Sequence, residues 1–260
     1  MAKVKLIELI AERGLAENEK EARALIMAGR VVVDVVVVDK PGTPVAEDAA
    51  VEVKGREKKY ASRGGEKLAA ALDAFGVEVA GRVCIDVGAS TGGFTSCLLD
   101  RGAELIYAVD VGKGLLAWEL RNDPRVVVIE GVNVRHFDGQ SLTPEPTLLV
   151  ADVSFISLTV ALERLLMNST GIEDAVVLIK PQFEAPKEDV EPGGVVTDPA
   201  VIRSMIEKVI KFFEQKGFGA RGLVESPAPG PAGNREFLLW AVRNKAAGIT
   251  ADDVTRALST

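Results

Sequence analysis

The stretch VCIDVGASTGGFTSCLL, residues 83–99, constrains the fold more than any other part of the chain. An apolar run that contains Asp86 leads into a turn with Gly88, Gly92 and Gly93, and a second apolar segment follows. A buried strand, a tight turn and a helix satisfy this pattern, because glycine permits the conformations and close approaches that the turn needs. The sequence therefore predicts the first strand–turn–helix unit of an α/β sheet.

Strand and helix patterns continue to alternate after this unit. Candidate strands cover 82–87, 104–109, 126–130, 147–151 and 174–180, and candidate helices cover 92–101, 113–121 and 157–167. A long helix over 199–216 and two strands near 218–225 and 235–243 follow, with SPAPGPAGN as the connection between the strands. This order predicts a Rossmann-like, mostly parallel sheet with helices on both faces. The last connection favours a hairpin, so we expect an antiparallel strand at the end.

The N-terminal part of the chain follows a different pattern. Apolar residues at helical spacing between residues 4 and 28 predict two short helices, with Asn18 as the N-cap of the second and Gly29 after its end. The valine-rich segment that begins at Arg30 predicts short strands joined by turns. We expect a small α+β module over 1–58 and a larger α/β domain over 59–260.

Charge and composition limit the classes of partner. The net charge is −7, but residues 1–67 carry 13 basic and 12 acidic residues, so any polyanion should be met at that end. No apolar run is long enough to span a bilayer, and charges interrupt the first apolar residues, unlike a signal peptide. Two cysteines in apolar contexts indicate reduced, buried thiols and a cytoplasmic protein, and a single histidine excludes a His/Cys metal cluster.

The glycine turn indicates the kind of small molecule that lies against it. Its six residues, 88–93, do not match the G-x-G-x-x-G of dinucleotide folds, and no Gly-Lys-Ser/Thr follows as in a P-loop. Asp110 ends the second strand, where a carboxylate can accept hydrogen bonds from both ribose hydroxyls. Acids before the turn and after the second strand favour S-adenosylmethionine, which has a cationic amino-acid part and no phosphate. The residues predicted to bind it are Asp86, Gly88, Ser90, Thr91, Gly92, Gly93, Phe94, Asp110, Asn133 and Asp152, with a turn as the alternative role for Asn133.

A hydrolase is a competing interpretation of the same turn. Gly88-x-Ser90-x-Gly92 matches the nucleophile elbow, and Asp110 and His136 follow in the order of an α/β-hydrolase triad. Against this, the elbow normally follows several earlier strands, whereas this turn follows the first.

Six motifs in order resemble one family. They are SRGGEKL (62–68), DVGASTGGFT (86–95), YAVDVG (107–112), ADVSFISL (151–158), LIKPQFE (178–184) and GNREFLL (233–239). Together they resemble the TlyA/haemolysin A family, in which an S4-type RNA-binding module precedes an FtsJ-like methyltransferase domain. The resemblance implies 2′-O-methylation of cytidine in 16S ribosomal RNA, 23S ribosomal RNA or both, with S-adenosylmethionine as the methyl donor. A catalytically silent RNA-binding adaptor and a membrane-lysing protein, suggested by the older family name, are the alternatives.

The resemblance also implies a catalytic set, which falls on Lys67, Asp152, Lys180 and Glu236. The strand pattern independently places Asp152 and Lys180 at the ends of the fourth and fifth strands. Lys180 is the candidate base for the ribose hydroxyl, and stabilising the developing alkoxide as a cation is its alternative role. We expect Glu236 to orient Lys67 or the ribose.

The candidate RNA contacts are basic residues at the N-terminal end of the chain: Arg23, Arg30, Lys40 and Arg63. The segment VVVDVVVVDKPG lacks the turn glycine that S4-like hairpins carry, so we expect a longer or distorted hairpin around Asp34 and Val35. Phe155 is either a pocket residue or, as we expect, a core residue.

Overall fold

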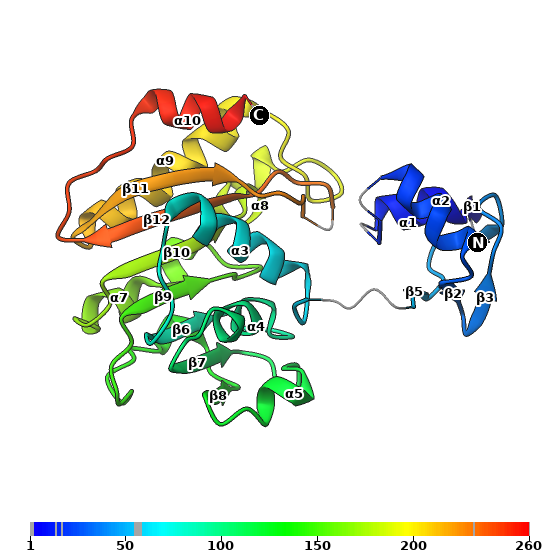
Figure 1. The fold of residues 1–260 in the computed structure, drawn as a ribbon. Coiled ribbons are helices and arrows are strands. Elements are labelled where there is room, and N and C mark those ends of the chain that lie inside the picture. Colours follow the sequence, from blue (N-terminus) through cyan, green and yellow to red (C-terminus); the bar gives the residue numbers. More distant parts are fainter. Residues whose placement is uncertain (1–2, 14, 17, 55–58, 231, 260) are drawn as a thin grey trace. The chain divides into compact units, whose positions relative to one another are not determined.

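Two units make up the computed structural model, residues 1–58 and 59–260 (Figure 1). The structure describes residues 3–13, 15–16, 18–54, 59–230 and 232–259. Residues 55–58, where the expected domain boundary falls, lie outside the described residues. Each unit has a hydrophobic core of its own.

The N-terminal unit holds the two predicted helices and short strands. Its elements are β1 (Lys3–Lys5), α1 (Leu6–Glu12), α2 (Glu19–Met27), β2 (Val31–Val33), β3 (Val36–Val38), β4 (Pro44–Ala46) and β5 (Val51–Val53). The Asn18 side chain accepts a hydrogen bond from the Glu21 amide at the start of α2, and Gly29 follows its end with φ +65°, as predicted. Strand β1, which the sequence did not predict, pairs with β4.

The hairpin at Asp34 and Val35 is distorted, as one half of the expectation had it, but it is not longer. Val33 pairs with Val36, so these two residues alone form the turn, with φ of 45° and 68°. Two positive φ values are typical of a type I′ turn, which matches the twist of the flanking strands. The main chain and side chain of Asp34 both bond to Ala50, at 2.9 Å each. These bonds hold a turn that a β-branched residue disfavours.

The C-terminal unit is built on a seven-stranded sheet, as the alternating pattern predicted. Its strands are β6 (Val83–Val87), β7 (Leu105–Asp110), β8 (Val126–Glu130), β9 (Leu148–Ala151), β10 (Asp174–Ile179), β11 (Phe218–Glu225) and β12 (Phe237–Arg243). The order across the sheet is β11-β12-β10-β9-β6-β7-β8. Strands β6 to β10 are parallel, and β12 runs antiparallel to both β10 and β11. The start of β12 therefore lies at the edge where the parallel strands end.

Helices cover both faces of the sheet (Figure 1). They are α3 (Arg63–Phe75), α4 (Gly93–Asp100), α5 (Trp118–Arg121), α6 (Leu158–Ala161), α7 (Glu163–Asn168), α8 (Pro181–Glu184), α9 (Pro199–Gln215) and α10 (Ala251–Leu258), with 3₁₀ turns at Val134–His136 and Lys187–Asp189. Helix α5 is much shorter than the predicted 113–121, and α3 and α10 were not predicted. One buried cluster joins α3 and α4 to the sheet, and another joins α6, α7, α9 and α10 to it.

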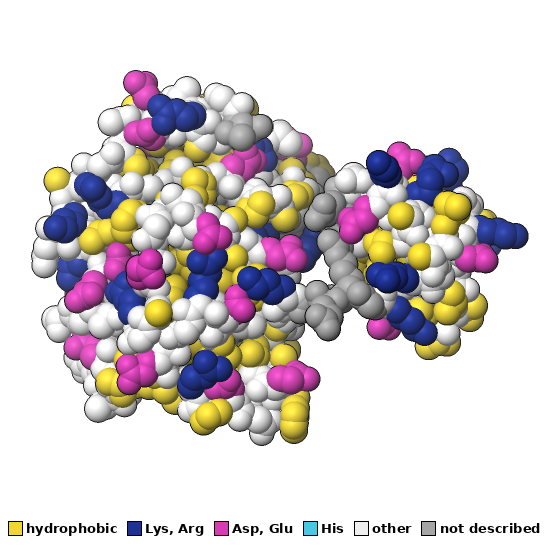
Figure 2. All heavy atoms as spheres, viewed as in Figure 1, with side chains coloured by type: hydrophobic (Ala, Val, Ile, Leu, Met, Phe, Trp, Pro, Cys, Tyr) yellow, Lys and Arg dark blue, Asp and Glu magenta, His cyan; other side chains and the backbone are white. Residues whose placement is uncertain are grey.

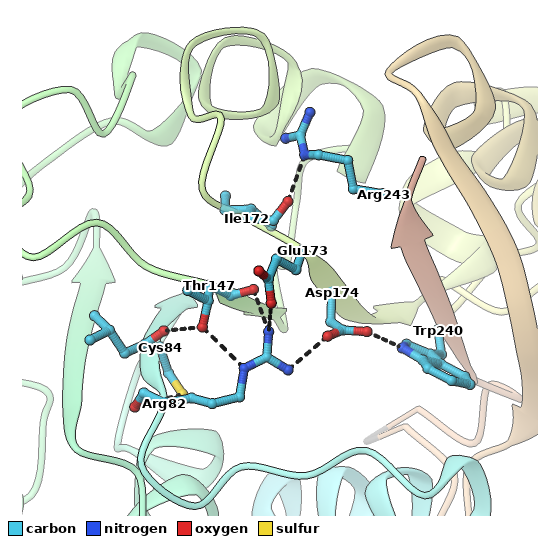
Figure 3. A network of polar contacts seen from close by, with 9 residues as sticks. Arg82, Cys84, Thr147, Ile172, Glu173, Asp174, Trp240 and Arg243 are labelled. Carbon is cyan, nitrogen blue, oxygen red and sulfur yellow. Dashed lines mark hydrogen bonds and ion pairs between the residues drawn. The ribbon is translucent and has the colours of Figure 1, made fainter. Parts of the chain in front are cut away.

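A polar network ties the amino ends of the strands together (Figure 3). Arg82, just before β6, donates to the Thr147 hydroxyl at 3.0 Å and to the Asp174 carboxylate at 2.7 Å. The other Asp174 oxygen accepts from Trp240 Nε1 at 2.8 Å. The network joins segments at β6, β9, β10 and β12. It lies at the opposite end of the parallel strands from the glycine turn, so it does not occupy the carboxyl edge of the sheet.

Candidate active site

The glycine turn lies at the carboxyl end of β6, with two glycines that no L side chain can replace without strain. Gly88 has φ +87°, and a Cβ there would lie 2.5 Å from the Asp152 carbonyl oxygen. Gly92 has φ +96°, and its Cβ would lie 2.1 Å from Leu120 Cδ1. The backbone of the turn can therefore approach Asp152 closely only because the sequence has glycine at these positions.

Gly93 has a different reason to be glycine. A Cβ at Gly93 would lie 2.2 Å from the Ser62 hydroxyl, and one at Gly65 would lie 2.7 Å from the Gly93 carbonyl oxygen. The N-termini of α3 and α4 therefore pack directly against each other. This contact brings α3, and with it Lys67, to the glycine turn.

Acidic side chains hold the turn from two sides. Asp110 accepts hydrogen bonds from the amides of Ser90, at 2.8 Å, and Gly112, at 2.6 Å. Asp86 is fully buried beneath the turn and accepts from the Thr95 hydroxyl at 2.6 Å. Burial raises the pKa of Asp86 to about 7, and the nearby charge of Asp152 adds to this rise. The Oδ1 atom of Asp86 has no hydrogen-bond partner among the described residues.

Asn133, the remaining predicted cofactor residue, is exposed. Its side chain accepts a hydrogen bond from the Arg135 amide at 3.1 Å, which is the turn role foreseen as its alternative. It does not line the cavity at the glycine turn.

Asp152 and Lys180 meet as an ion pair beside the turn. They follow the neighbouring parallel strands β9 and β10, so both lie at the same sheet edge. Asp152 Oδ1 and Lys180 Nζ are 2.6 Å apart, and the side chains are 25% and 12% exposed. Lys180 also donates to the Ser154 hydroxyl at 2.9 Å. The lysine amine is therefore held by oxygens of the loop after β9.

Lys67 and Glu236 form a second, more deeply buried pair. Lys67 Nζ and Glu236 Oε2 are 2.5 Å apart, and the side chains are 9% and 1% exposed. Ile179 pairs with Phe237, so Glu236 stands near Lys180 at the sheet edge. The helix turn before Lys67 contains Gly64, where a Cβ would lie 3.6 Å from Asp152 Oδ2. The four side chains thus come from α3, β9, β10 and β12 to one edge.

A small cavity of about 260 Å³ lies between the glycine turn and the Asp152–Lys180 pair, and neither Lys67 nor Glu236 lines it. It is lined by Ser62, Gly64, Gly88, Ala89, Ser90, Thr91, Gly93, Phe94, Asp152, Ser154 and Lys180. One side is the glycine turn with its exposed hydroxyls, and the other is the Asp152–Lys180 pair. The cavity therefore faces both a candidate cofactor surface and a candidate base.

Phe155 is a residue of this site that the sequence analysis placed wrongly. We expected it in the core, but it is 90% exposed and has φ +63°. Its ring centroid lies 5.1 Å from that of Phe183, and Lys180 Nζ lies 5.9 Å from the Phe183 ring centroid. A strained, exposed aromatic beside a charged pair is typical of a functional site. No sequence signal separates it from a core phenylalanine.

The four candidate RNA-contacting residues are all exposed, and three belong to the N-terminal unit. Figure 2 shows Lys and Arg side chains on the visible face of that unit, among acidic and apolar ones. Arg23 pairs with Glu19 at 3.5 Å. Arg63 lies in the C-terminal unit, in the first turn of α3.

The alternative chemistries find little support in the described part of the chain. There, no hydrogen bond joins the exposed His136 to Ser90 or Asp110. The Asp110 oxygens accept from the backbone amides of Ser90 and Gly112. The described residues include no group of three or more His, Cys, Asp or Glu placed to hold a metal ion. Cys84 and Cys97 are buried, free thiols, and burial raises their pKa to about 12 and about 11. Within the described ranges, no helix has the length and apolar character needed to cross a bilayer.

Comparison with known proteins gives two family matches. Residues 60–243 match the FtsJ-like methyltransferase family, and residues 4–51 match the S4 domain. The chain is 45% identical to the 16S/23S rRNA (cytidine-2′-O)-methyltransferase TlyA of Mycobacterium tuberculosis, covering 96% of this chain and 95% of that protein. It is 39% identical to Hemolysin A of Brachyspira hyodysenteriae, over 90% and 98% of the two chains. A solved structure from Streptococcus thermophilus that carries the hemolysin name has a TM-score of 0.77 and 36% identity, covering 100% of this chain and 95% of that one.

Proposed function

The chain belongs to the FtsJ-like methyltransferase family, here joined to an S4 domain, and on this premise we propose that it methylates the 2′-hydroxyl of cytidine in ribosomal RNA. The observation that carries the proposal is the meeting of Asp152–Lys180 and Lys67–Glu236 at the edge where the glycine turn lies. A silent adaptor would have no need of two such pairs. The six sequence motifs and the family matches both indicate a methyltransferase.

The residues around the cavity fit S-adenosylmethionine as the methyl donor. Gly88 and Gly92 keep side chains out of the turn, and Asp110 retains lone pairs directed away from the two amides it holds. The unpartnered oxygen of Asp86 is a buried acceptor below the same turn. We assign the amino-acid part to the turn and the ribose to Asp110. The donor supplies an electrophilic methyl group and carries no phosphate, in keeping with a turn that is not a P-loop.

The chemical task of the protein is to remove the proton from a ribose hydroxyl. We assign this to Lys180, whose amine is already held by Asp152 and Ser154 at the cavity. Lys180 first releases the extra proton of its ion pair to solvent and becomes a neutral amine. As the bond from the ribose oxygen to the methyl carbon forms and the methyl–sulfur bond breaks, the hydroxyl proton then passes to that amine. Lys67, fixed by Glu236, supplies a positive charge near the developing alkoxide. Holding the oxygen in line with the methyl group supplies the rest of the acceleration.

We expect exposed basic side chains and Phe155 to contact the RNA. Arg23, Arg30 and Lys40 of the S4 unit and Arg63 of α3 are assigned to phosphates, which position the substrate without reading its sequence. Phe155 is assigned to the target base, because exposed aromatic side chains stack on unpaired bases. With ribosomal RNA as the proposed substrate, we also propose a cytoplasmic location.

The test is direct product analysis. The full chain is incubated with isotopically labelled S-adenosylmethionine and separated ribosomal subunits, and the RNA is digested to nucleosides for mass spectrometry. We expect label in 2′-O-methylcytidine. Label on a base, on another nucleoside or on no nucleoside would refute the proposal. Release of acid from a chromogenic ester would instead favour the hydrolase that Ser90 suggested.

A further inference from the structure

The loops after β9 and β10 contact each other through non-covalent interactions at three places. Nearest the sheet, Asp152 pairs with Lys180, and beyond them the Phe155 and Phe183 rings pack at 5.1 Å. At the far end, Glu184 accepts from the Ser157 hydroxyl and from the Leu158 amide. These two distances are 2.5 Å and 2.6 Å. The loops are thus fastened at both ends, with the exposed, strained Phe155 between.

Glu184 is unusual among the acidic residues because it is 5% exposed and lies outside the catalytic set. Its only described cation partner is Lys208 of α9, whose Nζ lies 3.3 Å from the Glu184 carboxylate and 2.8 Å from its carbonyl oxygen. A buried carboxylate is costly unless it is paired and hydrogen-bonded. This carboxylate satisfies that condition by joining three segments: α8, the start of α6 and α9.

We infer that Glu184 is a positioning residue for the methyl-transfer reaction, and this inference rests on the proposed function. It fixes the loop after β9 against α8, so that Asp152 and Ser154 keep the Lys180 amine at the cavity. It also holds Phe155 in a conformation that costs free energy in isolation. Glu184 itself does not line the cavity, so it acts through the loops.

The variants are Glu184→Ala, Glu184→Gln and a matched control, Asp174→Ala. Asp174 is also a carboxylate with two accepted hydrogen bonds, but it lies at the amino edge of the sheet. Glutamine keeps the shape and an acceptor for the Leu158 amide, so it should rescue most of the loss. All three are compared with the wild-type chain below their unfolding temperatures.

Because a misplaced catalytic group costs roughly ten-fold to a hundred-fold in rate, we expect Glu184→Ala to lower kcat by that factor. The calorimetric Kd for S-adenosylmethionine should stay within about two-fold, since Glu184 does not line the cavity. The KM for RNA should rise, because the same loop holds Phe155, which is assigned to the target base. Hydrogen exchange over residues 152–158 should rise in Glu184→Ala and not in Asp174→Ala. Glu184→Gln should return kcat to within about three-fold of wild type.

Two results would overturn the inference: wild-type kcat in folded Glu184→Ala, or an equal loss of kcat in Asp174→Ala. If Glu184→Ala does not fold, Ser157→Ala decides, because it removes one loop-side bond and should still lower kcat, while an unchanged kcat contradicts the role. A wild-type chain that methylates no RNA refutes the proposed function instead, whereas methylating wild type with fully active variants refutes only the inference.

Discussion

Replacing both residues of the buried pair Lys67–Glu236 should leave the free energy of unfolding nearly unchanged but should abolish methyl transfer. The paired atoms are 2.5 Å apart, with side chains 9% and 1% exposed, so removing one partner leaves the other charge with almost no water. Breaking such a pair costs about 3–5 kcal/mol, whereas replacing both partners by apolar residues of similar volume is often neutral. Lys67→Met and Glu236→Leu should therefore each destabilise strongly, and the double variant should not.

The assay is unfolding in urea, monitored by the fluorescence of the tryptophan residues. The two tryptophans, Trp118 and Trp240, both belong to the C-terminal unit, so the signal reports the unit that holds the pair. We expect the double variant to lie within about 1 kcal/mol of wild type and the coupling energy of the cycle to be about 5 kcal/mol or more in magnitude. Methyl transfer should remain absent in the double variant. Single variants as stable as wild type, or an active double variant, would refute the reasoning.

Three further predictions concern the hairpin, the glycine turn and pH. Val35→Gly should stabilise the N-terminal unit by about 1 kcal/mol, measured by hydrogen exchange, because glycine adopts φ +68° without strain; faster exchange contradicts this. Gly92→Ala should abolish S-adenosylmethionine binding in calorimetry, since φ +96° strains any residue that carries a Cβ and the turn must shift; unchanged affinity would show that the turn adapts. Asp86 has a folded pKa of about 7 against 3.8, so this group destabilises the fold above pH 7 and the cost fades as pH falls toward 4. Asp86→Asn should then exceed wild type in stability at pH 8, by a figure on the order of 4 kcal/mol, with the gap narrowing to about 1–2 kcal/mol at pH 5 and closing only near pH 4; a gap independent of pH would count against the burial argument.

Sequence periodicity predicted the large sheet well because buried parallel strands are short apolar runs separated by helices. It located Asp152 and Lys180 at strand ends, because the apolar runs show where the parallel strands end. Helix α3 was missed although Ser62 caps its start and Gly76 follows its end in a left-handed conformation. Its two glycines near the start hid the helical pattern, and they are there because α4 packs against them.

The pairing of side chains was beyond the reach of periodicity. Lys67 and Glu236 are 169 residues apart and meet only because β12 inserts between β10 and β11. Their assignment came from the family resemblance alone. The tight turn at Val35 and the exposure of Phe155 likewise depend on tertiary contacts, which override local propensity.

Replacing Lys180 with methionine tests the central claim most directly, because it keeps an unbranched side chain as far as Cε and removes the amine. The measurement is the single-turnover rate of methyl transfer at saturating S-adenosylmethionine, with calorimetric affinity for the donor as the control. We expect the rate to fall by at least about a thousand-fold, roughly 4 kcal/mol of barrier, with donor affinity within about two-fold of wild type. A rate within a few-fold of wild type would show that the proton leaves by another route.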